Sequence, residues 1–386
     1  MRGRLDRLPF LWFVIASNKL VLSARETDGR LILTDNIPRR SDNNESDNIV
    51  VRRLSDETDI VNSYIHAYYY PEEGQSNTRF GESVTQVGDV NEDGTVDMAI
   101  GTPRYGTKNE GMVVLMMLMK NGLWSDYGLI YASDLGLEKT ERAQIGRALT
   151  VIKTHYAEDD GRVLLAISSK GQTMESQYFE GCVHLVYVSH SSETRTEVEL
   201  HSRFSGSDFG VNASHTPDFG RSVLGVGDWD RDGADIDDIL VGAPGFLSGC
   251  IFLLSPLRVY PLIDSIPAHI CGADIDPMQL QSGARFGASL ALVHNNTIVV
   301  GATSTSTIGS VYICTLSGDL NIESVIKLQT SSLGITIGDF FGASVATLFP
   351  HDLDGIPDTL DIAVGAPHMD DPNVSVFVLL QTYFQF

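Results

Sequence analysis

The chain has 386 residues, of which 42% are hydrophobic, so it is long enough to bury one large core or two ordinary ones. Lys and Arg total 27 against 50 Asp and Glu, and the formal net charge of -23 disfavours binding to nucleic acid or to an anionic membrane surface. We therefore expect cations to associate with this chain, and we expect no nucleic-acid partner.

The first element is a candidate signal peptide at residues 1–24. The charged run MRGRLDR precedes the short apolar run LPFLWFVIAS, and Leu22-Ser23-Ala24 fits a cleavage site. The alternative is that residues 11–16 form a buried strand. No apolar run in the chain is long enough to span a membrane. We therefore expect a secreted, cell-surface or lumenal location and no transmembrane anchor of its own.

Residues 25–79 form an N-terminal segment, and from residue 80 to residue 386 the chain is a series of repeats. Each repeat starts with Phe-Gly, a small or polar residue, Ser and an apolar residue. The starts are FGESV at Phe80, FGRSV at Phe219, FGASL at Phe286, FGASV at Phe341 and a weaker IGRAL at Ile145. Each start is followed by an apolar run that closes in a glycine turn such as AIGTP, LVGAP, VVGAT or AVGAP, and in LAISS in the weak unit.

The runs inside each unit are short, alternating and rich in β-branched residues, which predicts strands. In the third unit, SVLGVG, DILVGAP, GCIFLL and YPLIDSI predict four strands joined by glycine-rich turns. A recurring four-stranded antiparallel unit is typical of a β-propeller blade, because a blade buries its faces only against its neighbours. We therefore expect an all-β propeller in which the Phe side chains fill the space between blades.

The last unit supplies only three predicted strands, SVATLF, LDIAVG and VSVFVLL. The run IVNSYIHAYYY at residues 60–70 precedes the first repeat where other units hold a fourth strand, so it could complete this blade and close a ring of five. Alternatively, LWFVIAS and RLILT belong to a further, incomplete blade. The chain would then be part of a six- or seven-bladed ring.

The loop GDVNEDGTVDMAIG in the first unit fits a calcium site. Ca²⁺ takes six to eight oxygen ligands, which a tight loop can supply from alternate residues. The predicted ligands are the side chains of Asp89, Asn91, Asp93 and Asp97 and the backbone carbonyl of Thr95. An EF-hand would need Glu at the twelfth position, where this loop has Ile100.

Two later units repeat this loop. The third unit offers Asp228, Asp230, Asp232 and the carbonyl of Ala234. Its closing position is Ile236 when counted from the start of the loop and Asp238 when counted back from the glycine turn. The fifth unit offers Asp352, Asp354 and either Asp358 or Asp361, but it has Pro350 at the first ligand place, so we expect a weak or empty site. The alternative for each loop is a solvated turn, because Asp and Asn favour turns without any metal.

Phe-Gly, an Asp-rich loop and Gly-Ala-Pro, in that order, resemble the FG-GAP repeat of the integrin alpha-chain amino-terminal β-propeller. Similar repeats occur in the carboxy-terminal region of glycosylphosphatidylinositol-specific phospholipase D. The resemblance covers about residues 80 to 380. It implies a propeller, usually of seven blades, with calcium in hairpin loops and, as in integrins, a role in cell adhesion.

Cysteines and glycosylation motifs are compatible with secretion. Cys250 and Cys271 lie in consecutive strand-like runs, so they either form a disulfide across an antiparallel pair or remain buried thiols. Cys182 and Cys314 lie in apolar runs and are expected to be buried. Glycosylation sequons occur at Asn44, Asn212, Asn295 and Asn373.

We find none of the motifs GxSxG, HExxH, GxGxxG or a P-loop, so we expect a noncatalytic binding module. Its protein or glycan ligand is expected on the face opposite the calcium loops, where the Gly-Ala-Pro turns lie. Aromatic residues in those loops either anchor the ligand or cover the core: Tyr105, Tyr178, Phe179 and Phe246. The alternatives are a purely structural assembly domain and a hydrolase with its site at the propeller axis.

Overall fold

The computed structural model of the protein describes residues 23–27, 30–34, 49–51, 65–67, 78–120, 124–137, 141–152, 162–170, 180–191, 195–211, 217–233, 236–256, 268–294, 296–303, 308–328, 340–347, 360–367 and 374–381. The regular secondary structure of these residues is mostly strand, and turns join the strands. The helical elements among the described residues are the short turns η1 (Gly206–Phe209) and α1 (Gly272–Ile275). No helix in the described part of the chain has the length and apolar character needed to cross a membrane.

The expected all-β propeller is confirmed, with four four-stranded antiparallel sheets as its blades. The first blade comprises β5 (Ser83–Gly88), β6 (Asp97–Thr102), β7 (Met112–Leu118) and β8 (Trp124–Tyr131). The second comprises β9 (Leu149–Ile152), β10 (Val163–Ser169), β11 (Cys182–Ser191) and β12 (Arg195–Ser205). The third comprises β13 (Ser222–Gly227), β14 (Asp238–Ala243), β15 (Cys250–Leu254) and β16 (His269–Cys271). The fourth comprises β17 (Phe286–His294), β18 (Thr297–Ala302), β19 (Ser310–Leu316) and β20 (Ile322–Lys327).

The fifth sequence unit forms a three-stranded sheet of β21 (Ser344–Thr347), β22 (Leu360–Pro367) and β23 (Val374–Gln381). Two hairpins precede the blades: β1 (Ser23–Thr27) pairs with β2 (Arg30–Thr34), and β3 (Ile49–Val51) pairs with β4 (Ile65–Ala67). Within the described strands, β4 is thus hydrogen bonded to β3, and β23 to β22. Closure of the ring by residues 60–70 stays a prediction.

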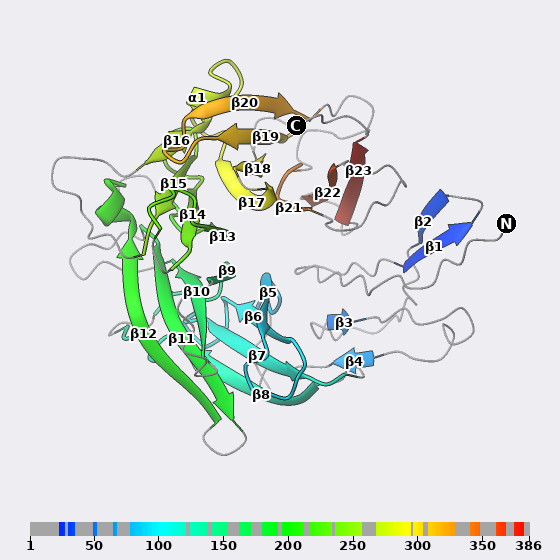
Figure 1. The fold of residues 1–386 in the computed structure, drawn as a ribbon, viewed down its shortest axis with the longest axis vertical. Coiled ribbons are helices and arrows are strands. Elements are labelled where there is room, and N and C mark those ends of the chain that lie inside the picture. The colour runs from blue at the N-terminus through cyan, green and yellow to red at the C-terminus, as the bar shows by residue number, and fades with distance from the viewer. Residues whose placement is uncertain are drawn as a thin grey trace.

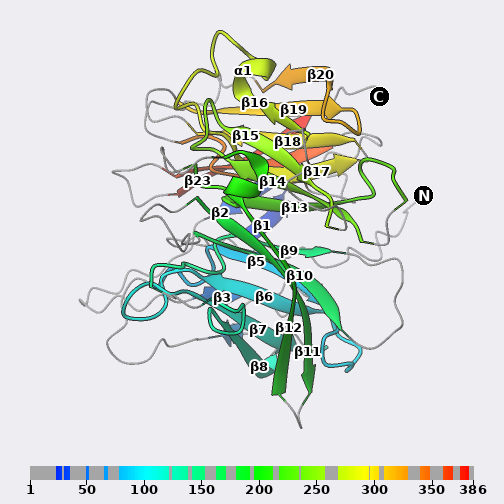
Figure 2. The same cartoon turned by 90° about the vertical axis from the view of Figure 1, so that its left-hand side faces the viewer.

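The sheets are arranged around a common centre, with the first strand of each sheet innermost (Figure 1). Strand β13 contacts both β9 and β17. Strand β5 contacts β9, and β21 contacts β17. The view turned by 90° shows successive sheets lying face against face (Figure 2). Each blade therefore buries its apolar faces against its neighbours, as a repeat architecture requires.

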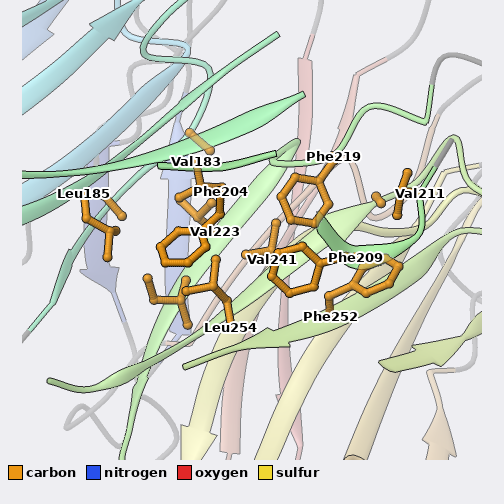
Figure 3. Close-up of a cluster of buried hydrophobic side chains, with 14 of the residues drawn as sticks. Val183, Leu185, Phe204, Phe209, Val211, Phe219, Val223, Val241, Phe252 and Leu254 are labelled. Carbon is orange, nitrogen blue, oxygen red and sulfur yellow. The ribbon is translucent and has the colours of Figure 1, made fainter. Parts of the chain in front are cut away.

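Aromatic side chains fill the space between blades. Phe219, Phe286 and Phe341 are fully buried, whereas Phe80 at the start of the first blade keeps 9% of its surface exposed. Between the second and third blades, Phe219 packs against Phe209 and Phe252, with ring centroids 5.2 and 5.8 Å away (Figure 3). The sequence role assigned to the repeated Phe is confirmed.

The turn glycines of the first, third and fourth units are required by the next blade. A Cβ on Gly101, Gly242 or Gly301 would lie between 1.9 and 2.2 Å from a backbone carbonyl oxygen of the following Phe-Gly or Ile-Gly start. A serine from the first strand donates a hydrogen bond to that same oxygen: Ser83 to Gly146 (2.7 Å), Ser222 to Gly287 (2.8 Å) and Ser289 to Gly342 (2.8 Å). Phe-Gly, Ser and the glycine turn are thus parts of one junction.

The weak second unit has the same junction, but two of its residues are replaced by other residue types. Ser168 takes the place of the turn glycine, because the backbone N–H of Gly146 donates to its carbonyl as Gly81 donates to Gly101. Ala148 takes the place of the junction serine. The Ser168 hydroxyl accepts a hydrogen bond of 2.8 Å from the Ala148 backbone N–H. The hydroxyl has therefore moved from one strand to its neighbour, which explains why this unit is hard to recognise in the sequence.

Two sequence predictions on the third blade have different outcomes. The strand expected at YPLIDSI lies outside the described residues, and the fourth strand of this blade is β16. Cys250 and Cys271 lie opposite each other on β15 and β16 and form a disulfide, which confirms one of the two alternatives. Cys182 and Cys314 are buried free thiols.

Candidate functional site

The loop between β5 and β6 is organised by its own carboxylates. Asp89 accepts hydrogen bonds from the backbone N–H groups of Asp93 (2.8 Å) and Gly94 (2.7 Å). Asp93 in turn accepts one from the N–H of Thr95 (2.9 Å), and the Asn91 amide donates to Asp93 (3.1 Å). These contacts join Asp89, Asn91 and Asp93 within a single turn. Among the described residues, three acids at metal-ligand spacing are found in the third unit and not in this loop.

Asp97 closes this loop from a buried position. Its two carboxylate oxygens accept hydrogen bonds from the backbone N–H groups of Val90 (3.0 Å) and Leu118 (2.8 Å), and its surface is 0% exposed. Burial raises the pKa of Asp97 and the two N–H groups lower it, while repulsion from Asp93 and Asp89 adds to the rise. A carboxylate that is buried beside other acids is stabilised by a nearby cation.

The loop between β13 and β14 has the same organisation. Asp228 accepts a hydrogen bond from the Gly233 N–H (3.2 Å), as Asp89 does from Gly94, and Asp230 accepts one from the Asp232 N–H (3.1 Å). One carboxylate oxygen from each of the three aspartates lies within 4.8 Å of the other two. Three hard oxygen donors at this spacing suit a divalent cation such as Ca²⁺.

Asp238 closes the second loop as Asp97 closes the first. It is 2% exposed, and it accepts hydrogen bonds from the backbone N–H groups of Trp229 (2.9 Å) and Asp230 (3.1 Å). Burial raises its pKa, although the Ser255 hydroxyl and these N–H groups act in the opposite direction. Ser255 also donates to Asp230 at 3.1 Å. We did not predict this serine, because its position beyond β15 lies outside the loop pattern.

Backbone conformation confirms that the two loops are equivalent in form. Gly88 and Gly227 have φ of 76° and 75°, and each lies at a register shift opposite the closing aspartate. Gly94 and Gly233 have φ of 82° and 72°, values that favour glycine. The second loop is longer, so its extra residues are accommodated before Asp238 rather than within the turn.

The register of β22 selects the closing acid of the fifth unit. Ser83 pairs with Gly101, Ser222 with Gly242 and Ser344 with Gly365. The closing residues Asp97 and Asp238 precede their glycines by four positions, and the corresponding residue of the fifth unit is Asp361, the first residue after Leu360 in β22. Asp361 therefore has the equivalent backbone position, which Asp358 does not.

Several predicted residues lie outside the described part of the chain. They are Ala234, Asp352 and Asp354 among the ligands, Asn44, Asn212, Asn295 and Asn373 among the sequons, Tyr178 and Phe179 among the aromatics, and residues 1–22 of the signal segment. Their predicted roles stay predictions.

The Gly-Ala-Pro turns lie on the face opposite the candidate metal loops, as expected. In β5 and β6, Ser83 pairs with Gly101 at one end of the hairpin and Gly88 pairs with Asp97 at the other. Of the loop aromatics on this face, Phe246 packs on the core with its ring 6.1 Å from that of Phe252. Tyr105 packs beside Tyr131 at 6.3 Å. Both rings are half-buried, so they cover the rim of the core.

Comparison of the sequence with protein-family models and with curated proteins finds no match to either.

Proposed function

We propose that this protein is a calcium-stabilised, integrin-like β-propeller that acts as an extracellular or lumenal binding module and catalyses no reaction. The observation that carries the calcium part is the equivalence of the loops at residues 89–97 and 228–238. Each encloses acidic side chains, each is closed by a buried aspartate, and each has glycine at the same two places. An uncompensated buried carboxylate destabilises a fold, so a bound cation would offset that cost.

In this proposal Asp89, Asn91, Asp93, the Thr95 carbonyl and Asp97 hold the first ion, and their equivalents from Asp228 to Asp238 hold the second. Bound calcium would supply charge neutralisation and would fix the hairpin between the first two strands of a blade. The resemblance to the FG-GAP repeat supports the same assignment. The fifth-unit loop, with Asp352, Asp354 and Asp361, is proposed as a weaker site.

The binding role is supported by a difference between the two faces of the propeller, one with the candidate calcium loops and the other with the Gly-Ala-Pro turns. On the face of the Gly-Ala-Pro turns, the loops differ in length and chemistry while the strands beneath them repeat, as in other recognition scaffolds. The Cys250–Cys271 disulfide supports an oxidising compartment. The acids at the inner ends of the blades, Glu82 and Asp218, are paired with arginines, which supports a noncatalytic centre.

The test of the calcium part is thermal unfolding of metal-stripped protein with and without added Ca²⁺. Because an ion that binds the folded loops shifts the folding equilibrium by mass action, millimolar Ca²⁺ should raise the Tm and EGTA should reverse the effect. Mg²⁺ at the same concentration should do less. A Tm that does not respond to Ca²⁺ in protein verified to be metal-free would refute this assignment.

A further inference from the structure

A cluster of charged side chains lies at the end of the inner strands that faces away from the candidate calcium loops. Its members flank the Phe-Gly and Ile-Gly starts of four blades. We call it the axial arginine cluster, and its members are Arg79, Glu82, Arg147, Asp218, Arg221 and Arg285. The sequence contains a signal for it that we did not use, because these residues stand directly before the Phe or directly after the Gly of each start.

The ion pairs place this cluster at the centre of the ring. Arg221 of the third blade lies 3.3 Å from Glu82 of the first blade, although the second blade stands between them in the ring. Blades that are not neighbours approach each other only near the axis. Arg147 of the second blade pairs with Asp218 of the third at 2.5 Å, and Arg285 of the fourth blade lies 3.7 Å from the same aspartate. Four blades thus contribute to one group of charges.

This group carries more positive than negative charge. Four guanidinium groups share two carboxylates, because Arg79 and Arg221 both contact Glu82, and Arg147 and Arg285 both contact Asp218. Burial raises the pKa of Asp218, but attraction to Arg147, Arg221 and Arg285 outweighs it and holds the pKa below its usual value. Asp218 is therefore ionised at neutral pH, and the excess of two positive charges remains. That excess is local, since the whole chain has a net charge of -23.

Arg285 is the member with unused hydrogen-bonding capacity. Its buried Nε–H has no hydrogen-bond partner among the described residues, and its 3.7 Å contact with Asp218 is longer than a hydrogen bond. Its side chain is 41% exposed, so part of the side chain can be reached from solvent although the Nε atom is buried. A guanidinium presents a planar fork of N–H donors that matches the two oxygens of a carboxylate.

We propose that the axial arginine cluster binds a carboxylate presented by a partner protein, on an acidic side chain of an exposed segment. This inference deepens the proposed binding function, on which it rests, by naming the chemistry of the ligand. An extended polyanion fits less well, because the chain as a whole has a net charge of -23 and would repel a ligand that carries many negative charges. A short acidic segment would place its negative charge only at the axial arginine cluster.

A titration with two labelled peptides tests this inference. Fluorescein-Gly-Gly-Asp-Glu-Gly-Gly with an amidated C-terminus supplies side-chain carboxylates, and its matched control replaces Asp and Glu with Asn and Gln. Fluorescence anisotropy at low ionic strength should show saturable binding of the acidic peptide and about tenfold weaker binding of the amide peptide, because hydrogen bonds to charged groups contribute that much. Added salt should weaken the acidic complex.

Two arginine variants separate the cluster from general surface charge. Arg285→Gln should weaken binding of the acidic peptide about tenfold. Arg162→Gln is the matched control, because Arg162 is also ion-paired and is 39% exposed, but it lies on the second blade away from the cluster, where it contacts Glu199. That control should bind the peptide as the unaltered protein does. In unliganded protein, Arg285→Gln should not lower the Tm more than Arg162→Gln, since it removes a cation from a group that has too many.

Absence of saturable binding up to about 1 mM peptide, or equal weakening by Arg285→Gln and Arg162→Gln, would overturn the inference. A heparin oligosaccharide that binds more tightly than the acidic peptide through Arg285 would overturn the choice of a protein partner. Running each titration with Ca²⁺ and with EGTA keeps the two proposals apart. If Ca²⁺ raises the Tm but the peptide fails to bind, this inference alone is wrong; if the peptide binds but Ca²⁺ has no effect, the calcium assignment alone is wrong.

Discussion

Replacing Gly242 with Ala tests the junction that joins successive blades. A Cβ at this position would lie 2.2 Å from the carbonyl oxygen of Gly287 in the next blade and 2.3 Å from the hydroxyl of Ser222. The carbonyl belongs to the backbone and cannot turn away as a side chain can. The hydroxyl also donates the 2.8 Å hydrogen bond to that carbonyl, so the new methyl group would disturb both the packing and the bond.

The magnitude follows from these two effects. Forcing an extra methyl group into a packed interface costs about 1–3 kcal/mol. Losing a buried hydrogen bond costs roughly a further 1–3 kcal/mol, because a donor and an acceptor are left without partners. Alanine offsets about 1 kcal/mol, since glycine is intrinsically unfavourable in a strand. We expect Gly242→Ala to lower the free energy of unfolding by about 1–5 kcal/mol.

Gly365→Ala is the matched control for this variant. Gly365 occupies the same place in the last sheet, but among the described residues the three atoms nearest to its added Cβ all belong to Ser344. That serine is exposed and its hydroxyl can rotate, so we expect a loss below about 1 kcal/mol. Urea unfolding followed by circular dichroism measures both variants, and a shifted midpoint with an unchanged slope reports a change in stability.

The second blade supplies a rescue experiment. In the second blade, Ser168 takes the place of the glycine and Ala148 the place of the serine. The double variant Gly242→Ser, Ser222→Ala introduces the same pair of residues into the third blade. It should recover at least about 1 kcal/mol relative to Gly242→Ser alone, as a coupling energy between residues in contact. Equal losses in Gly242→Ala and Gly365→Ala, or strict additivity in the double variant, would refute the account of the junction.

Three further predictions follow from other parts of the molecule. Asp93→Ala should reduce calcium affinity more than Asp354→Ala, because the fifth-unit loop has proline at its first ligand place; calorimetry at millimolar Ca²⁺ would reveal equal losses if the ranking of the loops is wrong. Burial, aided by a nearby arginine, lowers the pKa of His184 to about 3. The unfolded chain therefore binds a proton below about pH 6.5 that the folded chain does not, and this residue removes up to about 1.4 kcal/mol per pH unit as the pH falls from there toward 3. His184→Gln should make the dependence of unfolding on pH shallower by about one proton, and unchanged slopes would contradict the assignment. Replacing Cys250 and Cys271 with Ala should lower stability by about 2–4 kcal/mol, because the bond closes a loop across 21 residues; identical unfolding midpoints in the presence and absence of the bond would count against this.

The blades could be predicted from the sequence because one residue type serves one purpose at each repeat. Phe219 and Phe286 are buried between sheets, and Gly242 and Gly301 admit the backbone of the next blade. These requirements recur from blade to blade, so the same residue types repeat along the sequence. In the second unit, where Ser168 replaces the glycine, the motif is hard to recognise in the sequence although the junction is still formed.

The candidate metal loops were predictable for a local reason, since their ligands lie within a few residues of one another. The choice of Asp238 as the closing residue required the structure, because the two ways of counting along the sequence give different residues. The pairing of Gly227 with Asp238 decides between them. The axial arginine cluster was not predicted. Its members Glu82 and Arg221 are 139 residues apart, and their contact depends on the way the ring brings non-neighbouring blades together.

The most direct test of the proposed function is to count the calcium ions bound by metal-stripped protein. Isothermal titration calorimetry at millimolar Ca²⁺ should detect ions at the loops of the first and third units, because extracellular modules bind calcium at roughly 10⁻⁴ to 10⁻³ M. Asp93→Ala should remove one of these sites and Asp232→Ala the other, and the double variant should lose both. Binding that is absent in the unaltered protein, or that the double variant retains in full, would contradict the account.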